Sequence, residues 1–243
     1  MIKFFRKIRQ KLLTENKFSK YLFYAIGEIV LVVIGILIAI QINNWNESNK
    51  NREKEALLLT ELKANLKDDR IDLEYNIKYN KKRTEYNEII RTVIEEKIPY
   101  SDTLKPYFGK FFGNFQLSEN TSTWENLKSV GLDLISNDSL RNNISNLYSN
   151  RYQYLENLEK GLDDKYQWDF LYPQILKHIN LEELWVSGTP RNYEKWIKDE
   201  EFYEAIKLNL KFRYYMQNQY ENNHKLVLSL EEQIDRHLKS LNE

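Results

Sequence analysis

The sequence predicts an all-α protein: an N-terminal transmembrane helix, then an extracytoplasmic helical bundle of two or three long helices plus short ones. Glycine and proline are sparse, seven and four among 243 residues, and residues 43–98 and 191–243 contain neither. Apolar residues recur every three to four positions in these stretches, and alternating strand patterns are missing outside a short region at Trp185 and Val186. Long helices are therefore the main expected elements.

The first expected element is a transmembrane helix over residues 21–42. Residues 22–42 are a run of 21 mostly apolar residues with one acid, Glu28, and at about 1.5 Å per residue they span roughly 30 Å, the thickness of a bilayer's hydrocarbon core. A cleaved signal peptide is the alternative, but its apolar core is usually about 7–15 residues long and ends in a small-residue cleavage site. This run is longer and leads into polar residues, so we expect an uncleaved anchor in the lipid bilayer.

Charges on either side of the run predict its orientation. Residues 1–20 hold seven basic residues and one acid, whereas the flank after the run mixes both signs. Short basic flanks stay cytoplasmic. We therefore expect residues 1–20 to form a cytoplasmic arm and residues 43–243 to form a periplasmic domain. The candidate membrane-interface anchors are Lys17, Lys20, Tyr21, Tyr24 and Trp45.

One face of the membrane helix is a candidate helix–helix contact. Helical spacing places Glu28, Gly35 and Ala39 together, and Gly35 and Ala39 have the small-residue spacing that lets backbones approach. An acid in hydrocarbon is costly unless it finds a polar partner. Glu28 therefore either bonds across this contact or extends toward the inner headgroups.

The membrane helix is expected to continue outward through residues 43–98. Its apolar positions keep the helical period: Leu59, Leu62, Leu66, Leu73, Ile77, Ile90, Val93, Ile94 and Ile98. A coiled-coil-like stalk is an alternative, but Asp69 and Asn76 interrupt the heptads, which favours a bundle.

Five rings follow at positions i, i+1, i+4, i+5 and i+8, so that a helix would gather them on one face: Tyr107, Phe108, Phe111, Phe112 and Phe115. One interpretation is a docking face for a membrane surface or a partner. The other is core packing, which this spacing favours.

Two more long helices complete the bundle. One starts near Asn137 or Ser139 and runs toward Leu171, with Pro173 stopping or kinking it. The last starts after Asp199, a suitable cap, and keeps the helical period to the end of the chain.

The last helix contains one possible metal-binding motif. Glu221 and His224 have the Glu-x-x-His spacing of di-iron bundles, which need a second copy of that motif. The other two histidines are preceded at the matching position by Ile175 and Ile234. We therefore expect no metal there, and His224 to be an ordinary polar or packed residue.

Composition excludes several classes of function. There is no cysteine, which excludes disulfides, thiol catalysis and thiolate metal sites. The 36 basic and 36 acidic residues become 29 and 35 beyond residue 20, and this mildly acidic balance argues against a nucleic-acid partner. No phosphate-binding glycine loop, nucleophile elbow or zinc-protease motif occurs. We predict no catalytic residues, no cofactor and no enzyme.

The stretch from Gly27 to Glu47, GEIVLVVIGILIAIQINNWNE, closely resembles the opening of an uncharacterised family of Bacteroidota, chiefly flavobacterial, membrane proteins that carries a domain-of-unknown-function label. The resemblance is specific over roughly the first fifty residues and extends beyond them only in length and character. It implies a Gram-negative inner-membrane host and supports an anchor that stays in the mature chain. It implies no activity.

These observations favour a single-pass inner-membrane protein whose periplasmic helical domain binds other proteins as a scaffold, assembly factor or tether. The partner would be another membrane or periplasmic protein or a second copy of the chain. The alternative is a ligand-sensing bundle that holds a small molecule between helices and signals through a membrane partner.

Overall fold

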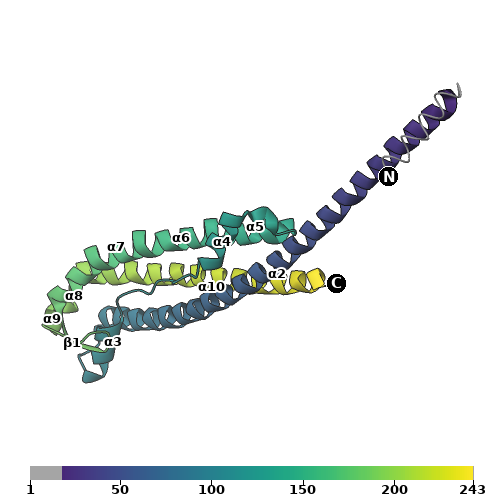
Figure 1. The fold of residues 1–243 in the computed structure, drawn as a ribbon. Helices are drawn as coiled ribbons and strands as arrows, with labels where there is room; N and C mark the ends of the chain where they lie inside the picture. The colour runs from purple at the N-terminus through teal and green to yellow at the C-terminus, as the bar shows by residue number, and fades with distance from the viewer. Residues whose placement is uncertain (1–17, 243) are drawn as a thin grey trace. The chain divides into compact units, whose positions relative to one another are not determined.

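The computed structural model describes residues 18–242 and confirms the all-α fold class (Figure 1). The chain divides into two compact units, residues 1–54 and 55–243. Its helical segments are α2 (Phe18–Glu95), η1 (Asp102–Leu104), α3 (Lys105–Lys110), α4 (Ser122–Val130), η2 (Leu132–Leu134), α5 (Asp138–Asn146), η3 (Leu147–Tyr152), α6 (Gln153–Glu156), η4 (Asn157–Asp163), α7 (Asp164–Tyr166), η5 (Gln167–Leu171), α8 (Tyr172–His178), α9 (Tyr193–Trp196) and α10 (Glu200–Asn242). The strands are β1 (Ile179–Glu183) and β2 (Ser187–Pro190).

The described part of the first unit is the beginning of α2. In the part of the chain that the structure describes, α2 is the one helix long and apolar enough to cross a membrane. Every side chain from residue 29 to residue 42 is exposed. Residues 1–17 of the predicted basic arm lie outside the described residues.

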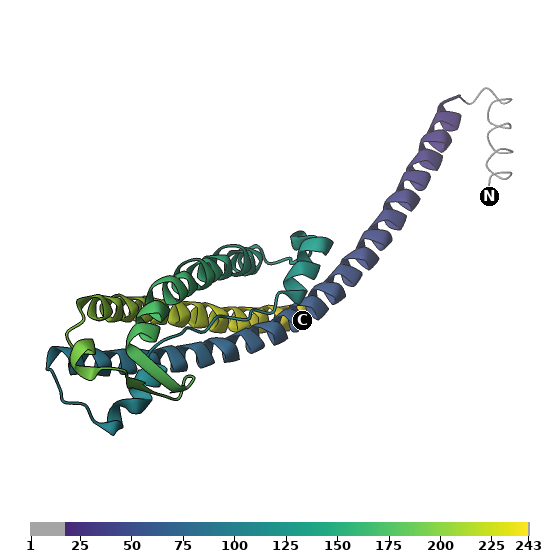
Figure 2. The same cartoon turned by 90° about the vertical axis from the view of Figure 1, so that its left-hand side faces the viewer.

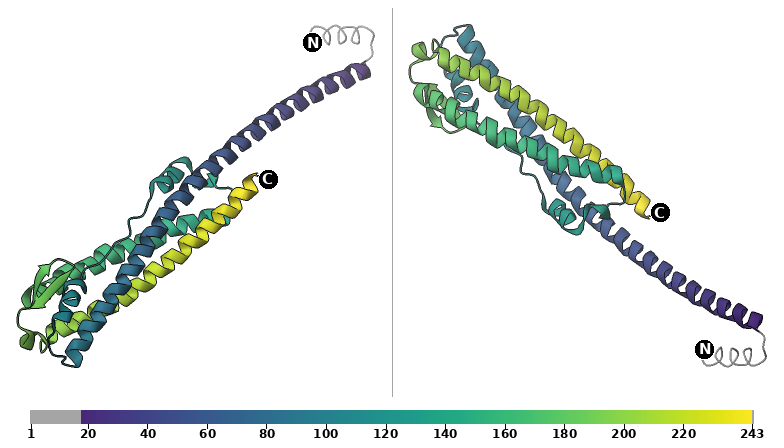
Figure 3. Two further views of the ribbon diagram at one scale, coloured as in Figure 1. Left: turned by 90° about the horizontal axis from the view of Figure 1, so that it is seen from below. Right: turned by 90° about the horizontal axis from the view of Figure 1, so that it is seen from above.

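Three long helical runs form the second unit. Residues 55–95 of α2, the consecutive segments α5 to α8 and helix α10 lie side by side in the views of Figures 1 and 3. We call the run from α5 to α8, residues 138–178, the segmented rod. The strands, α3 and α9 gather where α2 ends and α10 begins, which we call the hairpin end (Figure 2).

The predicted cap at Asp199 and the predicted helix start near Asn137 are confirmed. The Asn137 side-chain oxygen accepts a hydrogen bond from the Leu140 N–H at 3.0 Å, and the Asp199 carboxylate accepts one from the Phe202 N–H at 2.9 Å. Helix α2 ends at Glu95, three residues before the predicted end, and Lys97 adopts a left-handed backbone with φ of 52°.

Pro173 does not end the segmented rod, contrary to one of the predicted outcomes. The rod alternates α-helical turns with three π-helical stretches, η3, η4 and η5, and it continues through Pro173 to His178. In an α-helix the proline ring would clash with the carbonyl four residues earlier. The preceding π-helical stretch η5 has wider turns, which accommodate the ring.

The strand pattern was predicted at the wrong residues. Trp185 and Val186 lie in the turn of a short antiparallel hairpin, while the paired strands flank them, with Ile179 opposite Pro190 and Leu181 opposite Gly188. The hairpin packs directly on α3, since a Cβ atom added at Gly109 would collide with the Ser187 backbone. The strands escaped detection because they are short and mostly polar.

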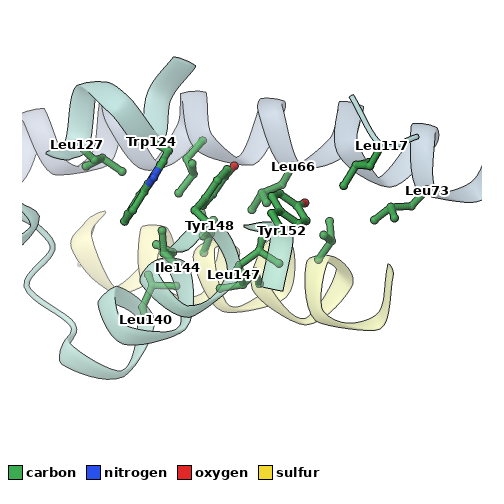
Figure 4. Close-up of a cluster of buried hydrophobic side chains, with 14 of the residues drawn as sticks. Leu66, Leu73, Leu117, Trp124, Leu127, Leu140, Ile144, Leu147, Tyr148 and Tyr152 are labelled. Atoms are coloured by element: carbon green, nitrogen blue, oxygen red, sulfur yellow. The ribbon is translucent and has the colours of Figure 1, made fainter. Parts of the chain in front are cut away.

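The core consists of two hydrophobic clusters. The larger one joins leucines of α2 to rings and aliphatic side chains of α4, the rod and α10, and Trp124 stacks on Tyr148 within it (Figure 4). The second cluster lies toward the hairpin end and is rich in aromatic residues, among them Phe108, Trp196 and Phe202. Asp69 and Asn76, which interrupt the heptads of the sequence, are themselves buried.

An irregular segment, residues 113–121, crosses the bundle between α3 and α4, and we call it the strap. Side chains bind its backbone N–H groups: Glu159 accepts from Leu117 at 3.0 Å and Asp69 accepts from Asn120 at 2.7 Å. Asp72 accepts from Ser118 in the same way. These carboxylates accept hydrogen bonds from the backbone of the strap, as the carbonyl groups of a neighbouring strand do in a sheet.

Candidate functional site

A layer of buried polar side chains runs through the bundle, and we call it the polar belt. Its members come from all three long runs: Asn80, Arg83, Asn87, Asp163, Gln167, Asn209 and Arg213. Arg213 and Asp163 form an ion pair, with each side chain 1% exposed. Such a pair stabilises only when its remaining donors and acceptors also find partners. Arg213 donates to the Asn80 side-chain oxygen at 3.2 Å and Gln167 donates to Asp163 at 3.4 Å, while Arg213 Nε is buried without a hydrogen-bond partner among the described residues.

Amide side chains connect the belt across the three runs. Gln167 donates to the Asn209 side-chain oxygen at 2.8 Å, and Asn209 donates to that of Asn87 at 2.9 Å. Asn87 in turn donates to the Phe111 carbonyl. The chain of bonds fixes the rod, α10 and α2 against one another and against the segment after α3.

Arg83 differs from Arg213 because no carboxylate is paired with it. Its residue is 9% exposed, and its Nη1 is buried without a hydrogen-bond partner among the described residues. The guanidinium lies 4.0 Å from the centroid of the Phe115 ring. Burial and the nearby positive charge of Arg213 lower the pKa of Arg83 to about 10, so it remains a cation at neutral pH.

Arg83 lines a cavity of about 230 Å³ close to the hairpin end, which we call the tip cavity. Its lining residues are Tyr79, Lys82, Arg83, Tyr86, Lys110, Phe115 and Trp185. They come from α2, α3, the strap and the hairpin turn, and they combine three cationic side chains with four aromatic rings.

The second hollow is a groove between the segmented rod and α10, with a volume of about 460 Å³. We call it the interhelical groove, and it is lined by Tyr166, Phe170, Gln174, Glu201, Glu204, Ala205, Lys207, Leu208 and Lys211. Phe170 and Leu208 are 63% and 45% exposed within it. Farther along the same two helices the exposed Tyr154 and Tyr215 share a hydrogen bond between their hydroxyls.

Two acids that hold the strap have unusual titration behaviour. Burial raises the pKa of Asp69 to about 6, although the hydrogen bonds from Asn120 and Tyr152 oppose the shift. Burial likewise raises the pKa of Glu159 to about 8, against the hydrogen bond from Leu117. Glu159 is therefore largely protonated at neutral pH.

The five predicted rings do not share one helical face. Helix α3 ends at Lys110, and Gly113, with φ of 84°, turns the chain into the strap. Phe108, Phe111 and Phe112 are fully buried in the aromatic cluster, so they offer no docking face. Tyr107 is partly buried against that cluster. Phe115, from the strap, instead lines the tip cavity.

The predicted membrane-segment residues lie in the first unit. Gly35 and Ala39 are exposed, Glu28 is half-buried, and Trp45 is 67% exposed. The remaining interface anchors are placed in less detail: Lys17 lies outside the described residues, and for Lys20, Tyr21 and Tyr24 only the helical backbone is described.

Glu221 and His224 contact different partners. Glu221 accepts a hydrogen bond from Gln217 at 2.8 Å, and the His224 ring nitrogen lies 3.2 Å from the Glu74 carboxylate. The residues that sequence reasoning missed are those of the polar belt. A signal existed, because Arg213 falls in register with buried Ile206, Tyr220 and Val227 on α10.

Residues 28–180, more than half of the chain, match the model of a family described as "Family of unknown function (DUF6090)". The matched range includes nearly all of the stretch from Gly27 to Glu47 and continues through the strap and the segmented rod. No curated protein and no solved structure matches the chain.

Proposed function

The chain belongs to the DUF6090 family of unknown function, and from that premise we propose that it is a single-pass inner-membrane protein whose periplasmic helical domain binds a partner protein along the interhelical groove. The host is a Gram-negative bacterium of the Bacteroidota. The domain acts as a scaffold or tether and performs no chemistry of its own.

The observation that carries the proposal is the exposed apolar floor of the groove. Phe170 and Leu208 are exposed beside buried Tyr166 and partly buried Ala205, although the bundle has a well-filled core elsewhere. Rings and leucines that remain exposed between two helices are suited to receive the apolar face of another helix. Burying both side chains would supply about 3–5 kcal/mol toward binding.

Charges along the groove favour a helical segment of a partner protein. Glu201 and Glu204 lie on the groove toward the start of α10, and Lys207 and Lys211 follow along the same face. A partner helix with basic residues at one end of its apolar face and acidic residues at the other would match this order.

The apolar segment of α2 supports the membrane address. Residues 29–42 expose their side chains all around the helix, a surface that requires hydrocarbon and not water. The seven basic residues before the run support a cytoplasmic N-terminus. Protease added to spheroplasts should then degrade the domain beyond residue 43, and full protection of that domain would contradict the orientation.

Site-specific photo-crosslinking in membranes tests the groove. A photoreactive residue replaces Leu208 in the groove or, as the matched control, Leu228, an α10 leucine of similar exposure that does not line it. We expect one defined adduct from position 208 and none from position 228, and we expect the further change Phe170→Glu to abolish it.

Three other crosslinking results would change or contradict this proposal. Equal adducts from both positions would mean nonspecific collision and would contradict the groove. An adduct of twice the chain's mass would identify the occupant as a second copy of the chain. No adduct from either position would refute the proposal.

A further inference from the structure

We propose that the tip cavity binds a small planar organic anion, a single aromatic ring that carries a carboxylate. The observation behind this is the juxtaposition of a buried, unpaired guanidinium with four aromatic walls. The inference goes beyond the groove and rests on different residues.

Charge is the first argument. The hairpin-end interior holds two buried guanidinium groups, Arg83 and Arg213, and the carboxylate of Asp163 is paired with Arg213. Lys82 and Lys110 add positive charge on the cavity wall, and none of the seven described lining residues is acidic. A buried cation without a counterion is costly, and an anion in the cavity would supply the missing charge.

The cavity walls indicate the shape of the uncharged part of the ligand. The Arg83 guanidinium carbon lies 4.0 Å from the centroid of the Phe115 ring, and a guanidinium over a ring can also bind a carboxylate through two parallel hydrogen bonds. Tyr79 lies against Phe115 with a centroid separation of 5.4 Å, and Tyr86 and Trp185 complete the lining. Flat apolar walls around one charged edge fit a planar ring with an acid group.

Size restricts the ligand further. A cavity of about 230 Å³ is smaller than the pockets of roughly 300–1,000 Å³ that hold drug-sized molecules. A one-ring acid fits within it.

Two local backbone features build the cavity. Gly113 has φ of 84°, a backbone conformation that favours glycine, and it lies close to both Arg83 Nη2 and Trp185 Nε1, which a Cβ atom there would meet at 3.4 and 3.5 Å. Trp185 has φ of 60°, a conformation that is rare for a bulky residue, and its ring is 54% exposed. A strained turn that holds a large ring open beside a cation is typical of a binding site.

The test uses the full chain in detergent micelles, with isothermal titration calorimetry and tryptophan fluorescence as readouts. The probes are benzoate, its neutral isostere benzamide, nonplanar cyclohexanecarboxylate and inorganic phosphate. We expect benzoate to bind in the micromolar to millimolar range and to perturb tryptophan emission, and each other probe to bind at least about tenfold more weakly.

Matched variants locate the binding. Lys82→Gln removes a cavity charge, and Lys81→Gln removes the neighbouring exposed charge of the same helix, which does not line the cavity. We expect about a fivefold loss of benzoate affinity for Lys82→Gln and no change for Lys81→Gln. Arg83→Gln should abolish binding, and because it also alters the polar belt, the two lysine variants keep the test decisive if it unfolds.

The outcomes that overturn the inference are distinct. Equal binding of benzoate and benzamide would show that charge does not contribute to binding. Phosphate binding as tight as benzoate binding would show that the rings do not contribute. Equal effects of Lys81→Gln and Lys82→Gln would place the anion elsewhere. Absence of benzoate binding at high millimolar concentration would refute the site, while the groove crosslink would be unaffected.

Discussion

Helix α2 carries the same apolar residue types in two settings with opposite exposure. Leu31 and Leu37 of the first unit are 64% and 59% exposed, whereas Leu62 and Leu66 of the second unit are fully buried. Nothing in the local chemistry of a leucine separates them. What differs is the polar residues between them, which in the second unit restrict the apolar side chains to one stripe. On the proposed membrane address, hydrocarbon covers the leucines of the first segment, whereas those of the second segment are covered by their own bundle.

The largest expected effect is a loss of stability in the second unit. Asp163→Ala leaves the guanidinium of Arg213 buried and unpaired, and we expect a loss of about 3–5 kcal/mol in the free energy of unfolding. Urea titration followed by near-UV circular dichroism, in micelles, measures it. Replacing the exposed Asp169 by Ala is the control and should stay within about 0.5 kcal/mol.

A second arm of that experiment separates pairing from packing. The double variant Asp163→Leu, Arg213→Met removes both charges and should recover most of the lost stability. A double variant as unstable as Asp163→Ala alone would show that the ion pair is not the source of the effect.

The next effect tests the comparison directly, by making the same change at two places in one helix. Leu66→Ala should cost the bundle about 2–5 kcal/mol, because it leaves a cavity in the larger cluster. Leu31→Ala should change the same unfolding transition by less than about 0.5 kcal/mol. Equal losses from the two variants would mean that the two segments do not differ as proposed.

The last effect concerns pH and only the second unit. The pKa of Glu159 is about 8 in the folded chain against an ordinary value of 4.5, so the folded state binds more protons than the unfolded state between these values. Stability should therefore fall as pH rises from about 5 to about 8, by at most about 1.4 kcal/mol per pH unit from this group.

Glu159→Gln sharpens that prediction. Glutamine keeps an acceptor for the Leu117 N–H and cannot ionise, so the variant should lose most of the pH slope and exceed the wild type in stability at about pH 8. Urea midpoints across this pH range measure both. An unchanged slope would assign the effect to another group, with Asp69 the next candidate.

Much of the fold could be predicted because local signals and tertiary structure agree. The helix start near Asn137, the cap at Asp199 and the long stretch without glycine or proline in α2 are read from neighbouring residues alone. The hairpin could not be read so easily, because its strands are short and its position depends on packing against α3. The prediction that five rings share one helical face failed for a related reason: Gly113 ends the helical spacing that would have joined them.

The candidate sites could not be predicted from the sequence, because their residues are polar. Polar residues within an apolar stripe read as breaks in a helix face, yet Asp69 and Arg213 are buried, and each is bonded to a partner from a distant part of the chain. Those partners are 51 residues or more away in the case of Asp69 and Asn120. Only the assembled bundle brings together the cations and rings of the tip cavity.

The polar belt also has a mechanical consequence. Moving α10 by one helical turn along its neighbours, about 5.4 Å, would carry Arg213 past the Asp163 carboxylate and break the Gln167–Asn209–Asn87 chain of bonds at once. An all-aliphatic interface would resist such a shift far less, since one leucine can replace another. The bundle is therefore stiff against sliding along its length, and a load applied to one long helix is shared by all three.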